Sequence, residues 1–114
     1  PEVMAANAHD QQLAWSSHLP QLAASTLALA LAQAGMPLSE LGRGGLDVTR
    51  LAGSDPELWT GVVLENAQHI VPALAAVEKL MAELRTRIEC GNEAEIRAAL
   101  GRALRWSYTA TAVE

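Results

Sequence analysis

The sequence predicts an all-α domain, and three features support this prediction. Half of the 114 residues are apolar, but Phe is absent and the aromatic residues are three Trp and one Tyr. A core built mainly from Leu, Ala, Val and Ile favours helices over sheets. Capping and helix-breaking residues divide the chain into segments of helical length, and the apolar residues of one long segment recur with a helical spacing. A chain of this length forms a single domain.

Two helices are predicted in the first part of the chain. Residues 2–17 are good helix formers, and Pro20 then forces a break or a kink because it has no N–H. The second helix runs from Pro20 to Ala34. Its leucines do not share one face, so either this domain or a partner subunit must surround it. The apolar run from Leu22 to Ala34 has roughly 13 residues, whereas a membrane span needs about 20, so we predict a buried helix.

Glycines and prolines mark the ends of the next helices. Gly35 to Gly45 reads as a loop, and a short helix follows from Leu46 to Ala52. Ser54 as the cap, with Pro56 in the first turn, predicts a helix that begins near Asp55.

The last part of the chain contains a long segment and a final helix. Asn66 and Pro72 predict a bend or a break before the chain continues to Gly91, which is a natural helix-terminating residue. Asn92 then caps a last helix that reaches about Tyr108.

Apolar residues in the long segment are spaced 4, 3, 4, 3 and 4 apart, which is a heptad pattern. We call this row the heptad seam, and its members are Ile70, Leu74, Val77, Met81, Leu84 and Ile88. The pattern has two interpretations, because such a row can form one edge of an ordinary helical core or can pack along a second subunit.

The distribution of charge singles out one arginine. Arg43 and Arg50 are the only basic side chains before Lys79, whereas most of the thirteen acids lie in that stretch. Arg50 either pairs with Asp47, three residues before it, or is available for an anion. The net charge of -5, with no basic stripe, argues against nucleic acid as a partner.

Several other classes of site are not indicated. The spacing of His9, His18 and His69 matches no metal-binding motif, and no Gly-rich turn follows a strand, so no metal or cofactor site is predicted. The single Cys90 forms no internal disulfide, and no signal-peptide pattern is present, which fits a reducing cytoplasm. Because the chain begins with Pro1, we interpret it as a processed or excised piece.

Short motifs, taken in order, resemble the C-terminal half of the prephenate dehydrogenase family. These motifs are His9-Asp10, Ser17-His18-Leu19-Pro20, the run from Asp47 to Pro56, and Trp59. The resemblance implies that residues 1–114 are the helical dimerisation and substrate-binding domain, similar to the C-terminal domain of 6-phosphogluconate dehydrogenase and arranged as an intertwined homodimer. It also implies an N-terminal Rossmann domain, absent from this chain, that binds NAD or NADP. The resemblance further implies that the whole enzyme oxidises and decarboxylates prephenate or arogenate in tyrosine biosynthesis.

The resemblance also implies roles for single residues. Arg50 matches the family arginine that contacts a substrate carboxylate, and His18 matches a histidine that lines the same pocket. Asp47 and Trp59 match positions near that pocket. No catalytic residue is expected in this chain, because the histidine that assists hydride transfer belongs to the missing domain, so the chain alone should be inactive.

Two departures from the family pattern bear on the substrate. Gln21 stands where many prephenate-using members have a second histidine, and Gly45-Leu46 stand where many have an aromatic residue and an arginine. Gln21 is therefore a candidate substrate-binding residue, and prephenate, arogenate and an aminated prephenate analogue of secondary metabolism all stay open. The alternative from a different class of function is a stand-alone, non-catalytic helical dimer that serves as an assembly module.

Overall fold

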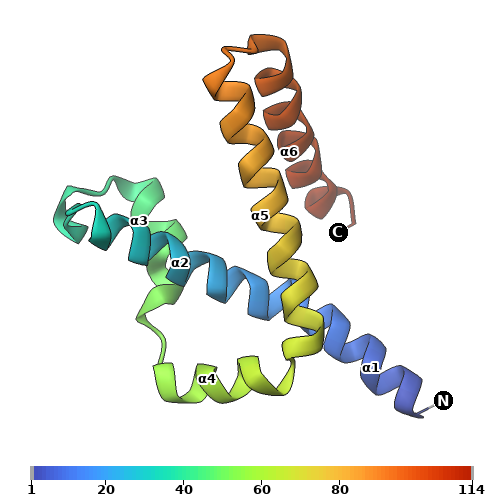
Figure 1. The fold of residues 1–114 in the computed structure, drawn as a ribbon. Helices are drawn as coiled ribbons and strands as arrows, with labels where there is room; N and C mark the ends of the chain where they lie inside the picture. Colours follow the sequence, from blue (N-terminus) through green and yellow to red (C-terminus); the bar gives the residue numbers. More distant parts are fainter. Residues whose placement is uncertain (1, 114) are drawn as a thin grey trace. The chain divides into compact units, whose positions relative to one another are not determined.

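The prediction of an all-α fold is confirmed. The structure is a computed structural model that describes the backbone of residues 2–113 and the side chains of residues 5–109, and no strand occurs among them. Figure 1 shows the order of the helices along the chain. The elements are α1 (Glu2–Leu13), η1 (Ala14–His18), α2 (Leu19–Gln33), η2 (Leu38–Glu40), α3 (Arg43–Thr49), η3 (Arg50–Gly53), α4 (Pro56–Glu65), α5 (Ala67–Glu89) and α6 (Glu93–Val113).

The chain divides into two compact units, and the boundary falls within α5. The first unit extends to Leu74 and contains the elements from α1 to the start of α5. In this unit α2 packs against η1, α3 and η3. The second unit begins at Ala75 and contains the rest of α5 and α6.

Of the break or kink predicted at Pro20, the break does not occur. The chain instead passes through the π-helical turn η1 just before it, in which the Leu19 N–H donates to the Ala14 carbonyl, five residues back. Proline has no N–H for the usual helical hydrogen bond, and its ring crowds the preceding turn. The wider π-helical turn accommodates both effects, so α1, η1 and α2 follow one another without a loop.

Two glycines end helices in the same way. Gly35 has φ +76° and Gly91 has φ +65°, a left-handed backbone conformation that an L side chain rarely adopts. After α2, the Met36 N–H donates to the Leu31 carbonyl, and after α5 the Asn92 N–H donates to the Arg87 carbonyl. Both ends are therefore Schellman motifs, and the prediction of a helix end at Gly91 is confirmed.

The start of α4 corrects one prediction. Asp55, not Ser54, is the capping residue, because the Asp55 carboxylate accepts a hydrogen bond from the Glu57 N–H at 3.0 Å. The Ser54 hydroxyl instead donates to the Leu51 carbonyl at 2.8 Å. Pro56 then occupies the first helical position, where its missing N–H costs no intrahelical bond.

Other helix ends also differ from the predictions. The short helix begins earlier than expected, because α3 starts at Arg43 and includes two glycines that we had assigned to a loop. The break after α4 falls at Asn66, and Pro72 lies inside α5 without interrupting it. The last helix, α6, passes Tyr108 and continues to Val113.

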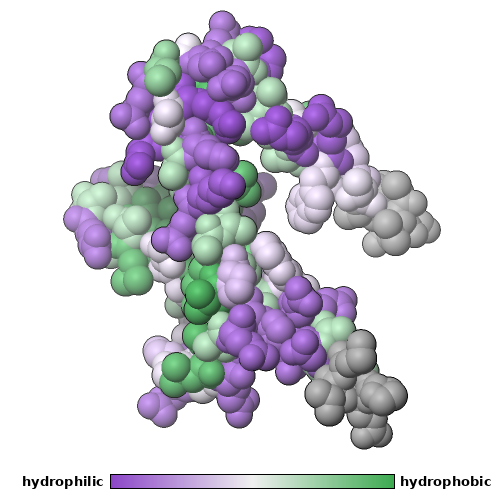
Figure 2. Space-filling view, turned by 45° about the vertical axis from the view of Figure 1, so that its right-hand side comes forward, coloured by the Kyte–Doolittle hydropathy of each residue, from purple (hydrophilic) through white to green (hydrophobic). Residues whose placement is uncertain are grey.

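A single copy of the chain buries little apolar surface. Among the side chains that the structure describes, the buried hydrophobic residues are Ala14, Ala24, Ile70 and Ala73, whereas Leu29 is 61% exposed. Figure 2 shows hydrophobic residues, coloured green, at the molecular surface. The apolar helix α2 is thus not enclosed by the described residues of one copy of the chain. No helix within the described range has the length and apolar character to cross a membrane.

Candidate functional site

Two of the predicted site residues lie one helical turn apart at the junction of η1 and α2. His18 ends η1 and is 8% exposed, and Gln21 is in the first turn of α2 and is 5% exposed. Both are polar side chains in the core of the first unit, and buried polar groups must find hydrogen-bond partners. Their partners come from residues that are distant in the sequence.

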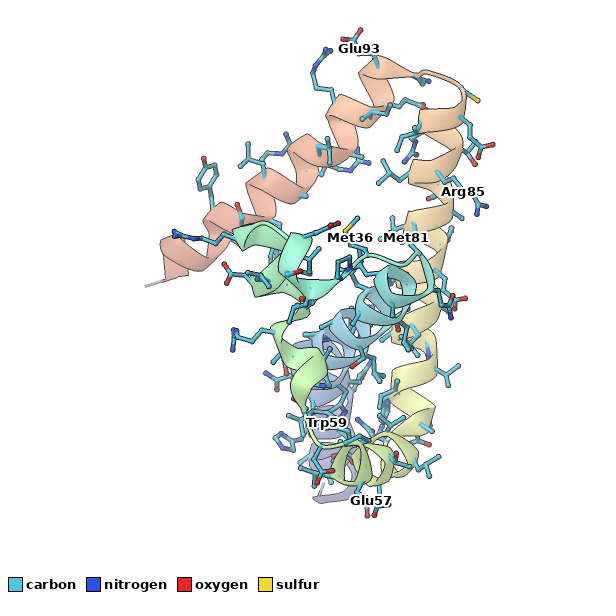
Figure 3. All side chains as sticks on the ribbon, turned by 90° about the vertical axis from the view of Figure 1, so that its left-hand side faces the viewer. Met36, Glu57, Trp59, Met81, Arg85 and Glu93 are labelled. Atoms are coloured by element: carbon cyan, nitrogen blue, oxygen red, sulfur yellow. The ribbon has the colours of Figure 1, made fainter. Side chains whose placement is uncertain are left out.

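His18 is held between an amide and an aromatic ring. Its Nδ1 lies 3.1 Å from the Nδ2 of Asn66, which separates α4 from α5. Its ring also meets the ring of Trp59 edge to face, with centroids 6.0 Å apart and an interplanar angle of 81°. Trp59 lies on the side of α4 opposite to Glu57, which points away into solvent (Figure 3). Together Asn66 and Trp59 limit the rotation of the His18 ring.

Gln21 connects α2 to the segment that follows Arg50. Its Nε2 donates to the Leu51 carbonyl at 2.7 Å, and its Oε1 lies 3.3 Å from the Ser54 hydroxyl. Both ends of the amide therefore contact the turn made by η3, so Gln21 fixes this turn against α2.

Replacing Gln21 by Ala should destabilise the first unit, because the substitution removes the hydrogen bond that joins α2 to the Leu51 carbonyl, which then keeps only local bonds from Ser54. We expect a loss of about 1–3 kcal/mol in the free energy of unfolding, measured by urea denaturation at a fixed protein concentration. Gln33→Ala is the matched control, because Gln33 is an exposed residue of the same helix. Equal urea midpoints for the two variants would contradict the role that we assign to Gln21, which is to hold η3 against α2.

Arg50 is solvent-exposed and begins η3. The preceding residue, Thr49, is buried, and its hydroxyl donates to the Gly45 carbonyl at 2.8 Å. Arg50 also lies on the wall of an open groove of about 510 Å³, whose other walls are mostly apolar and include Leu31, Met36 and Leu46. The backbone that carries Arg50 is thus held by Thr49 on one side and by the Gln21–Leu51 hydrogen bond on the other, whereas its guanidinium forms no ion pair with a described side chain.

Arg50 and Asp47 do not form an ion pair. Among the side chains that the structure describes, the ion pairs are Arg85–Glu89, Arg87–Glu95 and Arg97–Glu93, all in the second unit. Asp47 is exposed in the last two turns of α3. Of the two interpretations of Arg50, the ion pair with Asp47 is therefore absent from the described side chains.

The structure brings only part of the predicted site together. His18 and Trp59 are in contact, and Gln21 holds the turn next to Arg50. Among the described residues, Asp47 forms no ion pair or side-chain hydrogen bond with any of these four. The groove beside Arg50 is not lined by His18 or Trp59. A ligand that touched both Arg50 and His18 would have to bridge these two places.

Sequence reasoning missed the role of one residue. Asn66 was interpreted only as a helix breaker, but it is buried, and its side chain links α1, through the Asp10 carbonyl at 2.8 Å, to His18. A polar amide between two apolar helical segments was the only signal that could have indicated this role. No group of His, Cys, Asp and Glu suitable for a metal ion occurs in the part of the chain that the structure describes.

Fold and site together describe an all-helical domain that carries a free arginine and a small polar cluster and leaves much of its apolar surface uncovered. Residues 5–102 match the family model described as the prephenate dehydrogenase, dimerization domain. The chain belongs to this family, so the resemblance found in the sequence is confirmed.

Individual relatives agree with this assignment. The chain is 35% identical over 91 residues to cyclohexadienyl dehydrogenase of Zymomonas mobilis, an alignment that covers 75% of this chain and 31% of that protein. It is similar to the crystal structure of arogenate dehydrogenase from Synechocystis, with a TM-score of 0.78, 27% identity, and coverage of 90% of this chain and 40% of the other. It is also similar to prephenate dehydrogenase from A. aeolicus, solved with hydroxyphenyl propionate and NAD+, with a TM-score of 0.76, 28% identity, and coverage of 94% and 38%. The chain therefore spans less than half the length of these relatives.

Proposed function

We propose that this chain is the C-terminal domain of a dehydrogenase that oxidises and decarboxylates prephenate or arogenate in tyrosine biosynthesis, with NAD or NADP as the oxidant. In this proposal the domain supplies the dimer interface and a binding site for a substrate carboxylate. The family match and three dehydrogenase relatives support it. Because these relatives are longer than this chain and one of them was solved with NAD+, the proposal includes a nucleotide-binding domain of the Rossmann type that precedes this one.

The observation that carries the proposal is the state of Arg50. Its guanidinium is exposed and makes no ion pair with any described side chain, while the backbone that carries it is held in place by Gln21 and Thr49. A planar guanidinium can form two parallel hydrogen bonds to a carboxylate, which an ammonium group cannot. An arginine on a fixed turn, with no competing acid, is thus prepared to bind a carboxylate of the substrate.

The other residues then have supporting roles. In this proposal His18 contacts a part of the substrate outside the groove beside Arg50, and Trp59 and Asn66 orient its ring. Gln21 acts on the site mainly by holding η3, since both ends of its amide are already engaged. Asp47 is exposed on the helix that leads to Arg50 and is available to an amino group of an aminated substrate. The nicotinamide cofactor would accept the hydride, and its binding residues lie outside this chain.

Assays of the full-length protein and of this chain test the proposal. The full-length protein should reduce NAD or NADP in the presence of prephenate or arogenate and release carbon dioxide. The chain alone should bind neither nucleotide in a calorimetric titration, because helices without a Gly-rich turn offer no cradle for the phosphates. Micromolar binding of a nucleotide by the chain would contradict the division of roles, and an inactive full-length protein that still dimerises would favour the assembly module.

A further inference from the structure

We propose that Asn66 is a positioning residue that holds His18 in the tautomer with its proton on Nε2, so that His18 offers an N–H donor to an oxygen of the substrate. The existence of this tautomer follows from contacts within the first unit. Only the identity of the acceptor, a substrate oxygen, rests on the proposed function.

Asn66 occupies an unusual place for a residue at a helix start. Its backbone carbonyl accepts the first hydrogen bond of α5, from the Ile70 N–H at 3.0 Å. An asparagine at such a position commonly caps the helix with its side chain. Here the side-chain hydrogen bonds run away from α5, to Asp10 in α1 and to His18 in η1. Asn66 is 7% exposed, so its side chain is committed to these two partners.

The partner in α1 determines the orientation of the Asn66 amide. The Asp10 atom that it contacts, at 2.8 Å, is a backbone carbonyl oxygen, which can only accept a hydrogen bond. The Asn66 atom facing it must therefore be Nδ2, because the reverse orientation would bring two acceptors together. This determines which atom also faces His18.

The orientation of the amide in turn determines the tautomer of His18. The Nδ2 group has two protons, and the one not used by Asp10 is directed at the Nδ1 of His18, 3.1 Å away. Nδ1 must then be the acceptor, so the ring proton is on Nε2. No hydrogen bond joins Nε2 to any side chain or backbone group in the described part of the chain. The Nε2–H is therefore available to a ligand.

Trp59 completes the positioning. Its ring meets the His18 ring edge to face at 6.0 Å, which restricts the tilt of the imidazole while Asn66 restricts its rotation. A histidine held in this way can donate to a carboxylate or a carbonyl oxygen but cannot accept a proton at Nδ1 without losing the bond to Asn66. This arrangement assigns His18 the role of a donor in substrate binding.

The tautomer can be measured directly by NMR, without any activity. In the 114-residue chain labelled with 15N-histidine, long-range 1H–15N correlations should show an unprotonated Nδ1 and a protonated Nε2 for His18, with His9→Gln and His69→Gln used for assignment. In Asn66→Asp a carboxylate faces Nδ1, so the pattern should change to a protonated Nδ1. A protonated Nδ1 in the unmodified chain would overturn the proposal, even where Asn66→Asp does not fold.

A matched control separates this effect from the general loss of an asparagine. Asn7 also contacts a histidine, since its Oδ1 lies 2.8 Å from the Nε2 of His69, but this pair is at the surface. Asn7→Ala should leave the His18 signals unchanged. If Asn7→Ala and Asn66→Ala altered the His18 correlations equally, the effect would not come from the contact that we assign.

Kinetics of the full-length enzyme test the link to the substrate. Asn66→Ala should lower kcat/KM on the order of 10-fold, because the donor is no longer oriented. The same substitution in a His18→Ala background should cause no further loss, since the two residues act as a unit. Independent, additive losses would overturn the coupling between Asn66 and His18. An enzyme inactive toward both substrates would refute the proposed function, while the NMR result would still decide the tautomer.

Discussion

Replacing Arg50 by Ala in the full-length enzyme should lower kcat/KM by roughly 30-fold to 1000-fold, which corresponds to about 2–4 kcal/mol of transition-state binding. The loss should occur with the folding intact, because Arg50 is exposed and pairs with no described acid. A change below about 1 kcal/mol in the free energy of unfolding is expected for such a surface side chain. Steady-state kinetics on prephenate and arogenate, with a melting curve for each variant, measure both quantities.

Two further substitutions sharpen this test. Arg50→Lys should restore only part of the activity, since an ammonium group cannot reproduce the two parallel hydrogen bonds of a guanidinium. Arg43→Ala is the matched control, because Arg43 is also an exposed arginine but lies at the start of α3, whereas Arg50 follows the end of that helix. It should leave kcat/KM unchanged. An unaltered kcat/KM for Arg50→Ala on the better substrate would remove Arg50 from the site.

The second large effect concerns association of the chain with itself. The described side chains include four buried hydrophobic residues, three of which are alanines, and this is a small core for a domain of this size. Leu29 of α2 is 61% exposed, and Met81 of the heptad seam, which Figure 3 labels, is 64% exposed. Such uncovered apolar surface indicates an interaction site. We therefore expect the chain to be an obligate homodimer, as the description of its family also suggests.

Met81→Glu should disrupt this dimer. A carboxylate placed in a dry apolar interface loses its hydration without gaining a partner. We therefore expect the Kd of the dimer to rise by on the order of 100-fold or more. Where the dimer is required for folding, the same substitution should also abolish the cooperative unfolding transition. Sedimentation at low micromolar concentration, together with circular dichroism, distinguishes a dimer, a folded monomer and an unfolded chain.

Lys79→Glu provides the control for added negative charge. Lys79 is exposed and lies on the side of α5 opposite to the heptad seam. The control changes the net charge more than Met81→Glu does, but it should leave the dimer intact. A well-folded monomer of the unmodified chain, or equal dissociation by both variants, would refute the assignment of the seam to the dimer interface.

Most helix ends were predictable from the sequence. Gly91 ends α5, Asn92 caps α6 through its Oδ1, and Pro56 begins α4, as the residue types indicate. These signals are local, because each depends on a residue within four positions of the bond that it makes. One prediction that was wrong at this level concerned a choice between neighbours. Asp55 rather than Ser54 caps α4, since the Asp55 carboxylate accepts from the Glu57 N–H, whereas the Ser54 side chain is directed at the Leu51 carbonyl.

The candidate site was predictable only as a set of residues, without their contacts. The family motifs pointed to His18, Gln21 and Arg50, but not to the bond from Gln21 to Leu51, 30 residues away. The contacts of Asn66 with His18 and Asp10 span 48 and 56 residues. Such pairs depend on how the helices pack, because helical periodicity determines which face a side chain occupies but not which other helix that face meets. Arg50 illustrates the same limit, since its spacing from Asp47 allowed an ion pair that the folded chain does not form. The order and ends of the helices are thus set by local sequence, whereas the buried polar contacts that orient the site arise only when distant helices pack together.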